Sequence, residues 1–331
     1  MNIVDIWIGL LGLAIILYVV LDGFSLGIGM LFPFIRSAEE RDQMIESIAP
    51  VWDANQTWLV FSGGGLFVAF PLLYGVLFSA LYVPLFTLLY GLIFRGVSFE
   101  FRANAKRKGG WEQAFFWGSL IAVVSQGLTL GGILTGARTR EGHFAGSAFD
   151  WLTPFSVTAA IGLISGYLLL ASTYLIIKTT GAVQDRSYRQ AFWSAQIVLL
   201  FQIIMIAWTP FHYPQALANW SSPPRSYFIW IFPLLTLLAY VSILTGLRAR
   251  SEILPFFWSV VFFLAGFLGL IASVYPYALP PDITFYDAAA EYETLRFTLW
   301  GAALTLPFVL AYTLYSYFVF RGKAGKEGYY H

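Results

Sequence analysis

Long apolar runs alternate with short polar stretches along the whole chain. A window of roughly 19 residues, the length suited to a spanning helix, finds nine such runs, near residues 6–34, 51–73, 77–97, 114–134, 153–177, 190–211, 226–247, 255–277 and 295–320. Since a helix needs about 20 mostly apolar residues to cross a bilayer, each run is long enough to span a membrane. The pattern predicts an all-α integral membrane protein with about nine transmembrane helices.

The polar stretches between the runs are too short to hold a further domain. The longest lie near 35–50, 135–152, 212–225 and 278–294, and none is rich enough in Gly and Ser to serve as a domain linker. We therefore expect a single transmembrane domain over residues 1–331, arranged as two four-helix bundles plus one peripheral helix. Residues 35–50 mix acids with Met44, Ile45 and Ile48, which is typical of an amphipathic segment on the cytoplasmic surface. A solvated connector explains them equally well.

The distribution of Lys and Arg predicts the orientation of the helices, because cytoplasmic loops retain positive charge during insertion. With the N-terminus outside, 15 of the 19 basic residues lie on the inner side: Arg36, Arg41, Arg95, Arg102, Lys106, Arg107, Lys108, Lys178, Arg186, Arg189, Arg248, Arg250, Arg321, Lys323 and Lys326. The other four lie outside: Arg138, Arg140, Arg225 and Arg296. We therefore expect the N-terminus outside and the C-terminus in the cytoplasm.

Composition narrows the function classes. Hydrophobic residues make up 58% of the 331 residues and charged residues 11%, against roughly 25% charged residues in soluble domains, so lipid is the main solvent of this chain. A net charge of +1 argues against nucleic acid as a partner, which selects for concentrated positive charge. The absence of cysteine excludes disulfides, thiolate metal sites, iron–sulfur clusters and covalent c-type haem in this chain. The first apolar run has neither a basic region before it nor a cleavage pattern after it, which favours a retained span over a signal peptide.

Two aspartates within the apolar runs are the first candidates for function. Asp22 lies inside the first run, and Asp53 opens the second run from the cytoplasmic side. Placing a carboxylate in hydrocarbon costs at least about 2.5–3.5 kcal/mol, so an acid inside the membrane is a functional candidate by default. A structural alternative stays open for both: either aspartate could cap a broken helix or pair with Arg95, which would neutralise its charge without a transport role.

Helical spacing gives these acids polar neighbours. Residues three, four or seven positions apart share one face of a helix, and small residues let neighbouring helices approach closely enough to shield such a face from lipid. Gly23 and Gly27 are spaced for this packing, and Gly63, Gly64 and Gly65 follow in the second run. The three sets expected to share a face are Asp22, Ser25 and Gly29; Asp53, Gln56 and Thr57; and Arg95, Ser98 and Arg102.

The histidines argue against a redox centre in this chain. His143, His212 and His331 fall in an external loop, at an external helix end and at the C-terminus. Haem ligation within a membrane uses a His or Met from a helix interior. We therefore expect neither a haem ligand nor a metal site here, and no redox reaction by this chain alone.

Three segments that contain the polar sets resemble the signature segments of subunit II of cytochrome bd-type ubiquinol oxidases, including the cyanide-insensitive branch. They are residues 21–29 (LDGFSLGIG), 48–59 (IAPVWDANQTWL) and 94–102 (FRGVSFEFR). Order, spacing and position within the spans agree over the first third of the chain. The remainder agrees in helix count and length.

The resemblance implies a heterodimer in the bacterial inner membrane. In this family, subunit I carries two b-type haems and one haem d, oxidises quinol near the outer face and reduces dioxygen to water with cytoplasmic protons, whereas subunit II supplies no haem ligand. Small single-span accessory subunits, membrane lipids and quinone are the other partners that the resemblance suggests.

The resemblance also implies roles for individual residues. Asp53 lies near the start of a proton-uptake path and Asp22 farther in, while Arg95 tunes their charge or reaches a haem propionate of the partner. The supporting positions are Ser25, Gln56 and Thr57, which hold water between the two acids, and Glu100 beside Arg95. The family usually has a second aspartate at the position of Ser25; a hydroxyl can relay a proton but cannot store charge at neutral pH.

Two other functions stay open at this point. Polar, broken helices with an acid near the midplane also describe the substrate site of a secondary transporter. The chain could also be a scaffold subunit without a proton role, if both aspartates serve only structure.

Overall fold

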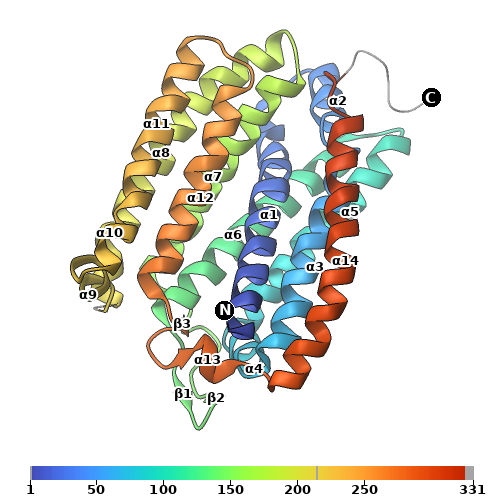
Figure 1. The fold of residues 1–331 in the computed structure, drawn as a ribbon. Coiled ribbons are helices and arrows are strands. Elements are labelled where there is room, and N and C mark those ends of the chain that lie inside the picture. The colour runs from blue at the N-terminus through green and yellow to red at the C-terminus, as the bar shows by residue number, and fades with distance from the viewer. Residues whose placement is uncertain (1, 214, 325–331) are drawn as a thin grey trace.

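The computed structural model describes residues 2–213 and 215–324, and within these ranges the chain is almost entirely helical (Figure 1). Lys326 and His331 lie outside the described residues. The longer helices are α1 (Ile3–Leu31), α3 (Trp52–Ala69), α5 (Tyr82–Asn104), α6 (Gly109–Thr135), α7 (Pro154–Lys178), α8 (Ala182–His212), α11 (Ile231–Arg248), α12 (Leu254–Val274) and α14 (Tyr292–Val319). The shorter elements are η1 (Phe32–Phe34), α2 (Ala38–Glu46), α4 (Pro71–Ala80), α9 (Gln215–Ser221), α10 (Arg225–Ile229), α13 (Phe285–Ala288) and two small hairpins, β1 (Thr139–Arg140) with β2 (His143–Phe144) and β3 (Tyr277–Leu279) with β4 (Ile283–Thr284).

Eight helices of the described chain are long and apolar enough to cross a membrane. The second apolar run of the sequence is the exception: α3 has only 18 residues, and its first turns carry the polar stripe around Asp53. It ends at Ala69, and α4 begins directly afterwards at Pro71, because a proline is tolerated at the start of a helix but not in its interior. With α3 running beside α1 and α14, the predicted all-α fold of about nine membrane helices is confirmed.

The long helices form two groups of four and one outer helix (Figure 1). The first group contains α1, α3, α5 and α6, and the second contains α7, α8, α11 and α12. Helix α7 joins the groups by packing against both α1 and α6, while α14 lies outside against α3 and α1. This is the expected arrangement of two bundles and a peripheral helix.

Close contact between the bundles depends on glycine in α1. An added Cβ at Gly27 would lie 2.1 Å from the backbone oxygen of Tyr167, and one at Gly23 would lie 2.8 Å from the ring of the same tyrosine. Any larger residue would therefore separate α1 from α7, as expected for small residues at helix interfaces. The same expectation is wrong for Gly63 and Gly64, which have open space around them.

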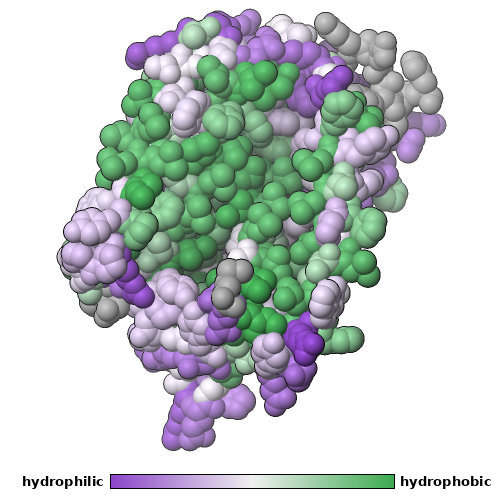
Figure 2. Space-filling model, viewed as in Figure 1, coloured by the Kyte–Doolittle hydropathy of each residue, from purple (hydrophilic) through white to green (hydrophobic). Residues whose placement is uncertain are grey.

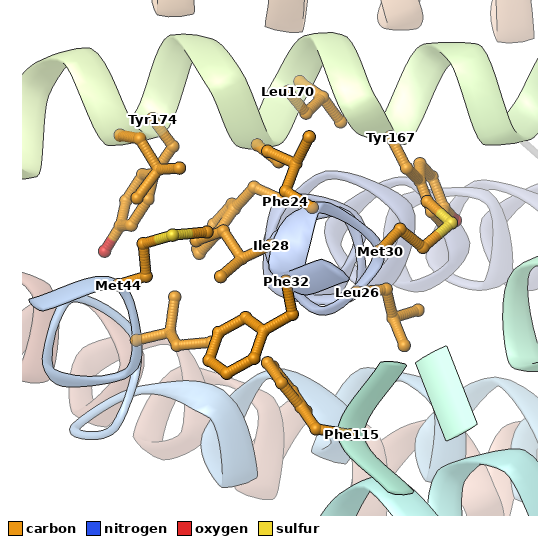
Figure 3. Packing of buried hydrophobic residues seen from close by; sticks show 14 of the residues in the cluster. Phe24, Leu26, Ile28, Met30, Phe32, Met44, Phe115, Tyr167, Leu170 and Tyr174 are labelled. Carbon is orange, nitrogen blue, oxygen red and sulfur yellow. The ribbon is translucent and has the colours of Figure 1, made fainter. Parts of the chain in front are cut away.

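The face of the molecule seen in Figure 2 is apolar in the middle and polar at both ends, as required of a protein with a hydrocarbon belt. Inside, the largest core cluster surrounds the second half of α1 (Figure 3). The segment 35–50 contributes to this core: it contains helix α2, and Met44 of α2 is fully buried beside Phe24 and Ile28. Residues 35–50 are thus a docked surface helix and not a solvated connector.

Candidate functional site

Asp22 lies where α1 is most enclosed. Every residue of α1 from 22 to 31 is buried, because α3, α6 and α7 all pack around this half of the helix. The Asp22 side chain has no exposed surface. A carboxylate in such a place needs a fixed partner, since an isolated buried charge is very costly.

Arg95 of α5 is that partner. Its Nη1 atom donates to Oδ2 of Asp22 at 3.0 Å, and its Nη2 atom lies 2.8 Å from Oδ1, which itself has no hydrogen-bond partner among the described residues. Arg95 also donates to the hydroxyl of Ser25, and its guanidinium lies 5.8 Å from the ring centroid of Trp52. The pairing with Arg95 that the sequence left open is therefore the arrangement found. The Arg95 side chain has no exposed surface in this chain and is directed at Asp22.

The Asp22, Ser25 and Arg95 cluster is electrically balanced. One carboxylate faces one guanidinium, and Ser25 adds a neutral oxygen. Removing one partner of a buried ion pair typically costs about 3–5 kcal/mol because it leaves an uncompensated charge. The cluster is thus a fixed feature of the folded chain.

Asn55 is a buried member of the polar group on α3 that sequence reasoning missed. It has no exposed surface, donates to the backbone oxygen of Leu21 at 2.8 Å and accepts from the hydroxyl of Tyr317 at 3.0 Å. One amide thereby ties α3 to α1 directly beside Asp22 and to α14. The sequence did contain one signal for Asn55, which is its position two residues after Asp53 in the same motif.

A second missed group lies on the side of Asp22 toward the start of α1. The carboxamide of Gln126 on α6 donates to the hydroxyl of Tyr18 at 2.6 Å and accepts from the hydroxyl of Tyr167 at 2.7 Å. Tyr18 lies one turn before Asp22 on α1, and Tyr167 packs on Gly23. This side-chain bridge joins α1, α6 and α7 above the ion pair.

Asp53 and its neighbours on α3 differ sharply from Asp22. Asp53 and Thr57 are exposed, while Gln56 is half-buried and its buried Nε2 atom has no hydrogen-bond partner within the described residues. The N-cap of α3 is Val51, so Asp53 does not cap the helix but stands in its first turn, where the helix dipole favours negative charge. Glu100 on α5 is also exposed. The predicted set therefore divides: Asp22, Ser25 and Arg95 meet, whereas Asp53, Thr57 and Glu100 face outward.

A charged network that the sequence did not predict lies where α5 ends and α6 begins. Arg102 contacts Asp42 at 2.7 Å and Glu112 at 2.9 Å, and Arg41 contacts Glu112 at 2.5 Å. Partial burial acts to raise the pKa of Asp42, but the hydrogen bonds from Arg102 and Lys108 outweigh it and hold that pKa below its usual value. The network fastens α2 to the ends of α5 and α6 and so fixes the short connection that leads into Asp53.

No group of three or more His, Asp or Glu residues that could hold a metal ion occurs within residues 2–213 and 215–324. His143 lies in the strand β2, and His212 is the last residue of α8.

Comparisons with known proteins agree on one family. A family model described as cytochrome bd terminal oxidase subunit II matches residues 3–320. The cytochrome bd-I ubiquinol oxidase subunit 2 of Escherichia coli strain K12 is 29% identical, with 97% of this chain and 95% of that protein covered. The cytochrome bd ubiquinol oxidase subunit 2 of Bacillus subtilis strain 168 is 25% identical, with 98% and 97% covered. A chain of the bd oxidase structure from Geobacillus thermodenitrificans has the same fold, with a TM-score of 0.79, 19% identity and coverage of 96% of this chain and 99% of that one.

Proposed function

Because this chain belongs to the cytochrome bd terminal oxidase subunit II family, and is therefore a multi-pass inner-membrane subunit of a quinol oxidase, we propose that it stabilises the haem-bearing subunit I and supplies it with cytoplasmic protons. In this proposal subunit I holds the b- and d-type haems and quinol is the substrate of the complex. The protons are consumed when dioxygen is reduced to water. Small accessory subunits, lipids and quinone complete the assembly.

The observation that carries the proposal is the outward face of α3. Asp53 and Thr57 are exposed there together with Val60, Gly64 and Phe67, and these five residues follow one another at spacings of four and three, so they form one stripe. A carboxylate at the inner end of an otherwise apolar stripe is poorly suited to lipid. In the proposed complex, subunit I covers this stripe and places a polar group next to Asp53. This explains why Asp53 is exposed in the single chain.

Asp53 is suited to take up protons because it is exposed near the proposed cytoplasmic end and forms no ion pair with another described residue. Gln56 and Thr57 lie within one turn of it, and the unpaired amide of Gln56 is suited to hold a water molecule. Asp22 takes part only when its pair with Arg95 opens. Otherwise the pair keeps a fixed, balanced charge beside the path, and Glu100 offers a second exposed carboxylate on α5.

The test replaces Asp53 by asparagine in the assembled oxidase. We expect Asp53→Asn to lower the steady-state rate of quinol-dependent oxygen reduction about tenfold or more, within the range of proton-transfer groups, while the visible haem spectrum is unchanged. Asp185→Asn is the control: Asp185 is likewise an exposed aspartate in the first turn of a helix, but unlike Asp53 it is held in an ion pair, with Arg250. It should leave the rate within about twofold.

The possible outcomes distinguish a proton-supplying subunit, a scaffold subunit and a transporter, which the sequence left open. Equal turnover in Asp53→Asn and wild type rejects the proton role and leaves a scaffold subunit. A variant that loses its haem spectrum shows that Asp53 serves assembly. A chain purified without any haem-bearing partner, which moves a solute, would point to a transporter; no family match supports that alternative.

A further inference from the structure

An apolar groove with one cationic end lies on the second bundle, away from the ion pair and from the α3 stripe. It has a volume of about 350 Å³ and is formed by α10, the start of α11 and the end of α12, which is near the lower limit of ligand pockets, about 300–1,000 Å³. The walls are Phe228, Ile229, Phe232, Leu268, Ile271 and Ala272, and the polar end holds Arg225 and Tyr275. An acyl chain suits these walls.

The floor of the groove is set by a close approach of α11 and α12. An added Cβ at Gly269 would lie 3.0 Å from the side chain of Phe232, so the two helices are in contact there. The groove beside this contact is open rather than enclosed, so a ligand can enter it from the surroundings of the helices.

Arg225 is oriented by a buried amide. Asn219 of α9 is 4% exposed; its oxygen accepts from Nη1 of Arg225 at 3.0 Å, and its nitrogen donates to the backbone oxygen of Ser273 at 2.9 Å. Arg225 has no ion pair with a carboxylate in the described part of the chain. A guanidinium has five N–H donors, so most of them are left for an anionic ligand at the end of the groove.

The groove ends at the depth of a lipid headgroup. Tyr275 at its polar end contacts the hydroxyl of Tyr286, which donates to Asp5 near the start of α1, so the groove opens at the end of the molecule where α1 begins. Trp220 and Trp230, joined by a hydrogen bond, lie beside Arg225 in sequence and structure. Tryptophan and tyrosine gather at membrane interfaces, and phosphate groups occupy the same level.

We propose that this groove binds an anionic phospholipid, with the phosphate at Arg225 and one acyl chain along α11 and α12. The proposal commits to a phospholipid because the groove offers one cation at the interface and hydrocarbon walls below it, and bidentate contact with phosphate is a property of arginine. It concerns the second bundle alone and does not depend on the proton role of α3.

The experiment measures retained lipid in the purified oxidase complex reconstituted with phosphatidylglycerol or phosphatidylcholine. Native mass spectrometry after detergent washing counts the phosphatidylglycerol molecules that stay bound. We expect Arg225→Gln, which removes the cation, and Ala272→Trp, which fills the groove, each to lower tight phosphatidylglycerol retention at least threefold. Arg140→Gln is the control, because Arg140 is an exposed arginine of the β1–β2 hairpin, outside the groove, and should retain the wild-type amount.

Two results would overturn the proposal. Equal retention in wild type, Arg225→Gln and Ala272→Trp means that no lipid is held in the groove. Equal retention of phosphatidylcholine and phosphatidylglycerol by the wild type means that the arginine does not select an anionic headgroup. The haem spectrum and quinol oxidase activity of the variants, which we expect to be unchanged, show that any loss of lipid does not come from misfolding.

Discussion

On α5, Arg95 and Arg102 point into the protein and each contacts a carboxylate, whereas Glu100 between them is exposed. Helix α3 shows the same division: Asn55 is fully buried and bonded on both sides, while Asp53, two residues earlier, is exposed. The inward faces of α3 and α5 therefore hold Asn55, Arg95 and Arg102, each with a fixed partner, whereas Asp53 and Glu100 on the outward faces form no ion pair among the described residues.

This difference separates two kinds of charged group. A charge paired with an opposite charge in a buried site is costly to separate from its partner, so the inward faces maintain the fold. The outward faces carry the exposed carboxylates on which the proposed proton uptake depends.

Arg95→Leu should cause the greatest loss of stability among these variants. It leaves the Asp22 carboxylate buried without its partner, so we expect a loss of about 3–5 kcal/mol of stability, seen as a lower thermal midpoint and poor recovery of the assembled complex. Glu100→Gln on the outward face of the same helix is the control and should change stability by less than about 0.5 kcal/mol. Similar stability losses in both variants would show that burial on α5 does not distinguish the two faces.

How far the sequence predicts this arrangement depends on the kind of feature. Apolar run length predicted the helices well, because lipid enforces a minimum span. The pairing of Asp22 with Arg95 was one of two alternatives, since spacing along separate helices does not show which faces meet. Glu112 was missed because an acid in the first turn of a helix usually serves the helix dipole at the surface, and only the docking of α2 brings Arg41 to it.

The exposure of Asp53 was also beyond the sequence. Its stripe was predicted as a polar face, but the direction of that face depends on how α3 rotates against α1, which the buried Asn55 and Trp58 fix. The sequence expectation that Gln56 and Thr57 share the surroundings of Asp53 holds for Thr57, which is exposed beside it, but not for Gln56, which turns partly inward. The spacing of polar residues identifies one face of a helix, and the packing of the helix determines whether protein covers that face.

A smaller test of the inward face is Asn55→Leu. The variant leaves the hydroxyl of Tyr317 without its acceptor, and an unsatisfied buried polar group costs about 1–3 kcal/mol. We expect the thermal midpoint of the complex to fall accordingly, with the haem spectrum retained. Thr57→Val on the outward face removes a hydroxyl from the same helix and should leave the midpoint nearly unchanged. A Thr57→Val variant as unstable as Asn55→Leu would contradict the assignment of the two faces.

Asp42 on α2, which bridges Arg102 and Lys108, should contribute least to stability. Because the folded pKa of Asp42 lies below its usual value, its contribution to stability is fully present above the unfolded pKa, about 3.9, and is lost as the pH falls through the lower folded value. The stability difference between wild type and Asp42→Asn should therefore be constant from pH 5 to pH 8, at less than about 1 kcal/mol for a partly exposed pair, and should shrink below about pH 4.

Thermal midpoints across this pH range measure the difference, with Glu46→Gln on the same helix as a control that lacks an ion pair among the described residues. A difference that changes between pH 5 and pH 8 would contradict the lowered pKa of Asp42. A constant difference agrees with a carboxylate that stays charged throughout that range and holds α2 in place.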